Sequence, residues 1–203
     1  MSLQGLKLAA LYSYDCRKAR MLKMNEILAQ FIATGMNPKK TAEVLKKLVS
    51  YDWYRLIAEN NGMPDPFSGK TVQAYWTGND LTKSISLQGK DLFLFHNFTV
   101  LTSPMPDLIS RDHCKISLGV VDDINGENLL VSYDALIFKE NKFELERQKT
   151  KIKKGFLWKV RKSDWIIFHV GIARKLATKE EMTSLCEKTI QAIKLFNSRA
   201  SQT

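Results

Sequence analysis

Apolar residues recur at helical spacing through most of the first ninety positions. One series spans residues 21–32, and a second spans residues 44–57 behind the start signal Asn37-Pro38. Residues three or four positions apart share one face of a helix, and a proline that follows a capping side chain is typical of a helix start. The pattern predicts a mainly helical domain over residues 1–110, with further helices at 6–11, 72–76 and 81–87.

The pattern changes at residues 92–102. The runs 92–95 and 98–101 are rich in aromatic and β-favouring residues, which are enriched in strands. We therefore expect one or two strands near 92–102. Pro104 and Pro106 then interrupt the chain, because each proline disfavours helix in the residue before it. This proline-containing stretch predicts a domain boundary close to residue 110.

Residues 111–203 predict a second domain made mainly of strands. Residues 115–121 and 165–168 are strand-like, and Asn125-Gly126 is a strong hairpin signal because both residues tolerate positive φ. A second turn is expected at Glu140-Asn141. Thr178 and Glu181 form a capping box that opens a final helix. The fold class we expect is α+β, with a helical N-terminal region and a small five-stranded OB-like β-barrel followed by a C-terminal helix.

The composition indicates in which cellular compartment the protein is expected. No apolar run approaches the ~20 residues needed to cross a bilayer, and the first residues lack the features of a signal peptide. The three cysteines, Cys16, Cys114 and Cys186, are widely spaced and include no C-x-x-C pair. This usage fits a reducing compartment. We expect a cytoplasmic protein with no transmembrane segment.

The sequence contains none of the common catalytic motifs. It has no G-x-S-x-G, no G-x-x-x-x-G-K-[ST], no G-x-G-x-x-G and no H-E-x-x-H. We therefore expect a binding or carrier protein rather than a self-contained enzyme. The aromatic residues Trp53, Tyr54, Tyr75 and Trp76 fit either a binding groove or the packing of helices.

The positive charge is concentrated in the second domain. The net charge is +10, and residues 139–162 hold 10 basic and 3 acidic residues. Such a field attracts nucleic acid, anionic lipid or an acidic protein, and it also fits a solvated lysine-rich face. Aromatic residues lie among the cations, which predicts single-stranded nucleic-acid binding as an alternative function. The residues concerned are Lys149, Lys151, Lys153, Lys154, Trp158, Lys159, Arg161 and Lys162.

Two stretches of the second domain carry a family resemblance. Residues 114–121 read C-x-x-x-x-G-x-V, and residues 163–173 read SDWIIFHVGIA. Both are similar to the signatures of the HypC/HupF chaperones that mature nickel–iron hydrogenases, a family of small five-stranded barrels. The chain departs from the family in two places. The family cysteine follows the initiator methionine whereas Cys114 is internal, and Leu118 stands where the family has proline.

The resemblance implies which residues meet a partner. In the family, the residue that matches Cys114 contacts an iron group and the hydrogenase large subunit that receives it, and the residue that matches His169 is characteristic. The implied partner is a hydrogenase large subunit or a maturation protein, and the implied cargo is iron, bound transiently through Cys114. His113 and His96 are further candidates, because imidazole and thiolate together suit a soft or borderline metal.

The whole chain also resembles an uncharacterised prokaryotic family that joins a helical region to this barrel. Residues 61–66 (NGMPDP), 72–79 (VQAYWTGN) and 96–100 (HNFTV) carry that second resemblance. It implies the architecture and no particular activity. The function expected from the sequence is a hydrogenase-maturation-type chaperone or adaptor that binds a partner protein through Cys114, His113 and His169.

Overall fold

A computed structural model describes residues 1–87 and 90–200 of the chain. The chain forms two compact units, Met1–Phe95 and His96–Thr203, which we call the helical unit and the barrel unit. The sequence placed the boundary near residue 110, and the units divide earlier. The reason is that two short helices, α7 (His96–Thr102) and α8 (Leu108–Cys114), pack on the last helix and on a strand of the barrel unit.

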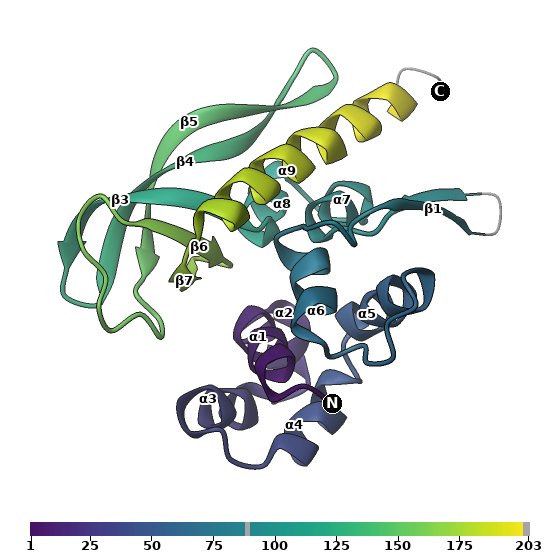
Figure 1. The fold of residues 1–203 in the computed structure, drawn as a ribbon. Coiled ribbons are helices and arrows are strands. Elements are labelled where there is room, and N and C mark those ends of the chain that lie inside the picture. The colour runs from purple at the N-terminus through teal and green to yellow at the C-terminus, as the bar shows by residue number, and fades with distance from the viewer. Residues whose placement is uncertain (88–89, 201–203) are drawn as a thin grey trace. The chain divides into compact units, whose positions relative to one another are not determined.

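The helical unit contains six helices and one strand pair among the residues that the structure describes (Figure 1). The helices predicted at 6–11 and 72–76 are present. The apolar series at 21–32 and 44–57 are each divided between two helices. The helices are α1 (Leu3–Ser13), α2 (Arg17–Met21), α3 (Asn25–Thr34), α4 (Pro38–Leu45), α5 (Val49–Asn60) and α6 (Gly69–Trp76).

Aromatic side chains form much of the interior of the helical unit. Tyr54, Tyr75 and Trp76 are each at most 3% exposed. The Trp76 indole donates a hydrogen bond to the Tyr54 hydroxyl, so the polar atoms of both rings are satisfied inside the core. The structure thus favours packing over a binding groove as the role of these three residues.

The helix predicted at 81–87 is wrong. The hydroxyl of Thr82 donates to the carbonyl of Ala74 and accepts a hydrogen bond from the backbone of Asn79, which turns the chain after α6. The chain then enters strand β1 (Ser84–Leu87), which pairs antiparallel with β2 (Lys90–Phe93). These side-chain bonds compete with helix formation, as threonine and asparagine commonly do in turns.

The predicted strand at 98–101 is also wrong, because these residues lie in helix α7 (His96–Thr102). The Asn97 side chain accepts from the backbone N–H of Ile116 and donates to the carbonyl of the same residue. Phe98, Val100 and Leu101 are all buried. Tertiary contacts therefore override the strand propensity of these residues, which is a context-dependent quantity.

The barrel unit is a closed sheet of five strands in the order β3-β4-β5-β7-β6 (Figure 1). Strand β3 pairs with both β4 and β6, which closes the sheet. The mixed fold class, the five-stranded sheet and the C-terminal helix expected from the sequence are confirmed. The elements are β3 (Ser117–Asn125), β4 (Asn128–Lys139), β5 (Lys142–Lys153), β6 (Trp165–His169), β7 (Ile172–Leu176) and α9 (Lys179–Ala200).

The two hairpin turns and the helix cap predicted for the barrel unit are present at the predicted residues. Asn125 pairs with Asn128 across the first hairpin, and Lys139 pairs with Lys142 across the second. The hydroxyl of Thr178 accepts from the backbone of Glu181, whose carboxylate accepts from the backbone of Thr178 in return, so the capping box at α9 is formed. No helix in the described part of the chain is long and apolar enough to cross a membrane.

Candidate thiol and imidazole site

A short helix presents Cys114 at the edge of the barrel. Helix α8 (Leu108–Cys114) begins at Asp107, whose carboxylate accepts a hydrogen bond from the backbone N–H of Ser110 at 2.6 Å. Cys114 is its last residue, and β3 begins only at Ser117, so the expected strand at 115–121 starts two residues late. Cys114 is a partly buried residue, so part of its surface is accessible to solvent.

Asp112 fixes the last turn of α8 to strand β4. One carboxylate oxygen accepts from the Tyr133 hydroxyl at 2.7 Å, and the other accepts from the backbone N–H of Leu136 at 2.6 Å. Hydrogen bonds to a charged acceptor are stronger than neutral ones. Asp112 therefore ties the end of α8, two residues before Cys114, to β4.

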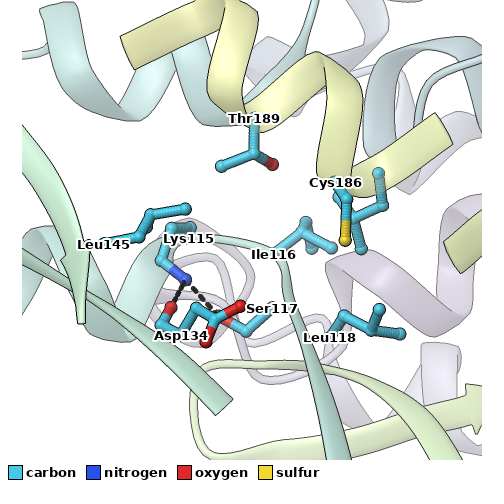
Figure 2. Close-up of a pocket in the computed structure, with 9 residues that line it drawn as sticks. Lys115, Ile116, Ser117, Leu118, Asp134, Leu145, Cys186 and Thr189 are labelled. Atoms are coloured by element: carbon cyan, nitrogen blue, oxygen red, sulfur yellow. Dashed lines mark hydrogen bonds between the residues drawn. The ribbon is translucent and has the colours of Figure 1, made fainter. Parts of the chain in front are cut away.

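Lys115, the residue after Cys114, is held by hydrogen bonds to Ser117 and Asp134 (Figure 2). Its ammonium is 5% exposed and donates to the Ser117 hydroxyl at 2.7 Å and the Asp134 carbonyl at 2.9 Å. The Asp112 carboxylate lies 3.7 Å away. Burial lowers the pKa of Lys115, and the negative charges of Asp112 and Asp134 oppose that effect. The hollow beside the ammonium is only about 30 Å³, so this lysine holds structure rather than a substrate.

His169 lies at the end of β6 and faces the cysteine. The residue is 1% exposed, and its Nε2 atom lies 3.9 Å from the Cys114 sulfur. The buried guanidinium of Arg174 donates to the His169 carbonyl at 3.0 Å. The β6–β7 turn that follows contains Val170 and Gly171, both with positive φ, and Val170 donates its backbone N–H to the carbonyl of His113 at 3.0 Å. The end of β6 is thus tied to α8 next to Cys114.

His96, the first residue of α7, completes the cluster. Its Nε2 atom lies 3.0 Å from the carbonyl oxygen of Cys114. A carbonyl only accepts hydrogen bonds, so Nε2 carries the proton and Nδ1 keeps a lone pair. Burial lowers the pKa of His96 to about 4, although the hydrogen bond to Cys114 opposes the shift. The imidazole is therefore neutral near pH 7.

The three side chains together form a possible metal-ligand set. One ligand atom from each of His96, Cys114 and His169 lies within 4.8 Å of the others. The two imidazole rings meet edge to face, with ring centroids 5.2 Å apart and an interplanar angle of 82°. One sulfur and two imidazole nitrogens suit iron, zinc, copper or nickel, and metal binding requires neutral histidine and deprotonated cysteine. The donor set therefore fits the iron implied by the resemblance.

The other predicted site residues lie elsewhere. The imidazole of His113 is exposed and lies against Gly171, and the residue takes no part in the cluster. The basic residues from Lys149 to Lys162 lie on β5 and on the loop that follows it. The structure thus brings two of the three predicted partner-binding residues, Cys114 and His169, into one place.

Sequence reasoning gave little weight to His96 and missed the residues that hold the site. Asp112, Lys115 and Arg174 read as ordinary surface charges in the sequence. The contact of Lys115 with the Asp134 carbonyl spans 19 positions, and the sequence carries no local signal for it. The only available hint for His96 was its place within the motif at residues 96–100.

The geometry describes a small closed-barrel protein with a partly accessible thiol between two histidines. The chain belongs to DUF6390, a family of unknown function. The family model matches residues 100–203, slightly more than half of the chain. The matched segment contains Cys114 and His169 and begins after His96. No significant similarity to a curated protein or to a solved structure was found.

Proposed function

We propose that the protein is a hydrogenase-maturation-type chaperone or adaptor that binds a partner protein at Cys114. The observation that carries the proposal is the approach of the Cys114 sulfur to within 3.9 Å of His169. These are the two residues that the resemblance to the HypC/HupF family selects, and they are separated by 55 positions. Their meeting supports an interpretation in which both serve one site.

The accessibility of the thiol supports a role in binding another molecule. Cys114 is partly buried, so its neighbours hold the residue in place while part of its surface remains accessible to a partner. A thiol sealed within the core would serve packing only. The closed five-stranded sheet with its C-terminal helix also agrees with the OB-like barrel of the family that the chain resembles.

The cargo that we propose is an iron group, held transiently. Cys114 would supply a thiolate, and His169 and His96 would supply imidazole nitrogens. His96 is neutral and donates from Nε2 to the Cys114 carbonyl, so its imidazole needs no deprotonation before it binds a metal. The hydrogen bond from His96 Nε2 to the Cys114 carbonyl also holds the two residues close together before any metal arrives.

In this proposal the protein binds and transfers rather than catalyses. The partner would be a hydrogenase large subunit or a maturation protein, and the setting would be the cytoplasm. Cys114 is internal, so a free N-terminal amine cannot join the thiol as a ligand. His96 would take that place in the donor set.

Affinity purification with a matched pair of cysteine variants tests the proposal. The wild-type chain and Cys186→Ser should retain a hydrogenase large subunit or another metalloenzyme component, identified by mass spectrometry, whereas Cys114→Ser should lose it. Cys186 is a suitable control because it is exposed on α9 and outside the cluster. Equal retention by all three chains, or recovery of no metalloenzyme component by any of them, would overturn the proposal.

A further inference from the structure

A row of cations lies along the outward face of strand β5. Arg147, Lys149, Lys151 and Lys153 alternate along the strand, and all four are exposed. Alternate residues of a strand point to the same side and are about 6.7 Å apart. The row therefore places four positive charges in a line with nearly even spacing, close to the separation of successive phosphates in an extended single strand.

Two of the four cations in this row form ion pairs with acidic residues, and among the described residues the other two do not. Arg147 forms an ion pair with Asp134 at 3.3 Å, and Lys149 forms one with Asp122 at 3.1 Å. Lys151 and Lys153 lie opposite the neutral residues Leu130 and Asn128 on β4. Within the ranges 1–87 and 90–200, no carboxylate lies at ion-pair distance from Lys151 or Lys153. This end of the strand therefore carries the two cations of the row whose charge no ion pair within the described residues offsets.

The loop after β5 adds four cations and an exposed indole to the same end. Lys154, Lys159, Arg161 and Lys162 belong to this loop, and Trp158 is 85% exposed. Leu157 packs against the barrel core and Val160 is 8% exposed, so the residues on either side of Trp158 are anchored inward. This anchoring holds the indole outside the barrel. The exposed ring is therefore accessible for stacking on a ligand.

A hollow adjoins the uncompensated cations. It has a volume of about 210 Å³, enough for a nucleobase, and its lining includes amide side chains that can hydrogen-bond to a base edge. The backbone N–H of Lys154 donates to the carbonyl of Glu127 at 2.8 Å, which holds the start of the loop beside the β3–β4 turn that forms the hollow. The lining residues are Asp123, Asn125, Asn128, Leu129, Leu130 and Lys151.

We propose that this surface, formed by Lys151, Lys153 and the loop 154–162, binds single-stranded nucleic acid. The cations contact successive phosphates, and Trp158 stacks on a base, a contact that is tolerant of sequence. Charge alone would suit an anionic membrane or an acidic protein equally well. The linear row of cations, the exposed ring and the hollow of base size together favour a polymer that carries one base for each phosphate. The site lies outside the Cys114 cluster and is independent of the proposed function.

Fluorescence anisotropy with labelled 20-nucleotide oligo-dT and oligo-U tests this inference on the full chain. Three variants are compared with the wild type, each checked for an unchanged melting temperature. Trp158→Ala should weaken binding by about 5- to 150-fold, the range that base stacking on an aromatic ring supplies. The pair Lys151→Glu and Lys153→Glu should lower the slope of log K against log salt by about 1.4, since about 0.7 is lost for each phosphate contact in single strands.

The control is the pair Lys39→Glu and Lys40→Glu, which changes the net charge equally at two exposed positions of α4. It should change the affinity less than twofold. The inference is overturned if Trp158→Ala binds like the wild type, or if the control pair weakens binding as much as the β5 pair. Tighter binding to vesicles with one quarter phosphatidylserine, or to poly-glutamate, than to either oligonucleotide would also overturn it.

Discussion

The Nε2 atom of His169 lies 3.9 Å from the sulfur of Cys114, although 55 positions separate the two residues in the sequence. Strand β6 carries the histidine and helix α8 carries the cysteine, so the fold of the barrel unit creates this pair. His96 reaches the same place from α7 and bonds to the Cys114 backbone. Three separate elements therefore meet at a single partly accessible sulfur.

The first prediction concerns the neutral imidazole of His96. Its pKa is about 4 in the folded chain against 6.5 for a free histidine. The unfolded chain therefore takes up a proton between pH 6.5 and 4 that the folded chain does not, and stability falls as the pH falls through this window. The contribution is complete above pH 6.5, and its loss amounts to about 3 kcal/mol by pH 4.

Urea unfolding of the wild type and His96→Gln, with a chelator present, measures this contribution. Glutamine keeps a donor for the Cys114 carbonyl and does not titrate. The stability difference between the two chains should shrink by about 3 kcal/mol from pH 7.5 to pH 4. The groups that face His96, namely Cys114 and His169, are unchanged in both chains. A difference that is constant across this range would contradict the prediction.

The second prediction concerns the anchor beneath Cys114. Asp112→Ala removes the acceptor of the Tyr133 hydroxyl and the Leu136 backbone, and it leaves the buried Lys115 ammonium without its nearest carboxylate. We expect a loss of about 3–5 kcal/mol in the free energy of unfolding. Asp107→Ala, which removes only the N-cap of the same helix, should cost about 1 kcal/mol. Chemical denaturation of both variants makes the comparison, and equal costs would show that Asp112 is no anchor.

Both the confirmed and the mistaken parts of the sequence-based fold have physical explanations. The turn at Asn125-Gly126 and the capping box of Thr178 and Glu181 depend on residues close in sequence, so their chemistry can be read directly. Helix α7 and the strand pair β1–β2 depend on remote partners. The hydrogen bonds between the Asn97 side chain and the Ile116 backbone stabilise the helical conformation of α7. Propensity scales do not include such long-range contacts.

Only those residues of the candidate site that lie within a recognisable sequence motif could be predicted from the sequence. Cys114 and His169 were selected because each lies in a stretch that resembles a family signature. His113 was selected by adjacency to Cys114, and it lies outside the cluster, whose third member, His96, comes from another element. Asp112 contributes through its bond to Tyr133, 21 positions away, which only the packing of α8 on β4 brings about.

The third prediction concerns backbone strain beside the site. Val170 has φ of 48° in the turn after His169, and a β-branched residue is costly in that left-handed region. Val170→Asn creates Asn-Gly, the preferred pair for a turn with two positive φ values. We expect a gain of about 1 kcal/mol in stability, measured by urea unfolding. Val170→Ile keeps the branched side chain and should give no gain; if asparagine gains no more than isoleucine, the backbone there is not strained.

The most direct test of the account is the iron bound per chain after anaerobic incubation with ferrous iron and gel filtration. The wild type and Cys186→Ser should each retain about one iron, because the thiolate and two imidazoles form one ligand set. Cys114→Ser should retain less than about a tenth of that amount, and His169→Gln should retain an intermediate amount. Equal iron in the wild type and Cys114→Ser, or no iron in the wild type, would contradict the proposal that Cys114 is where the cargo is held.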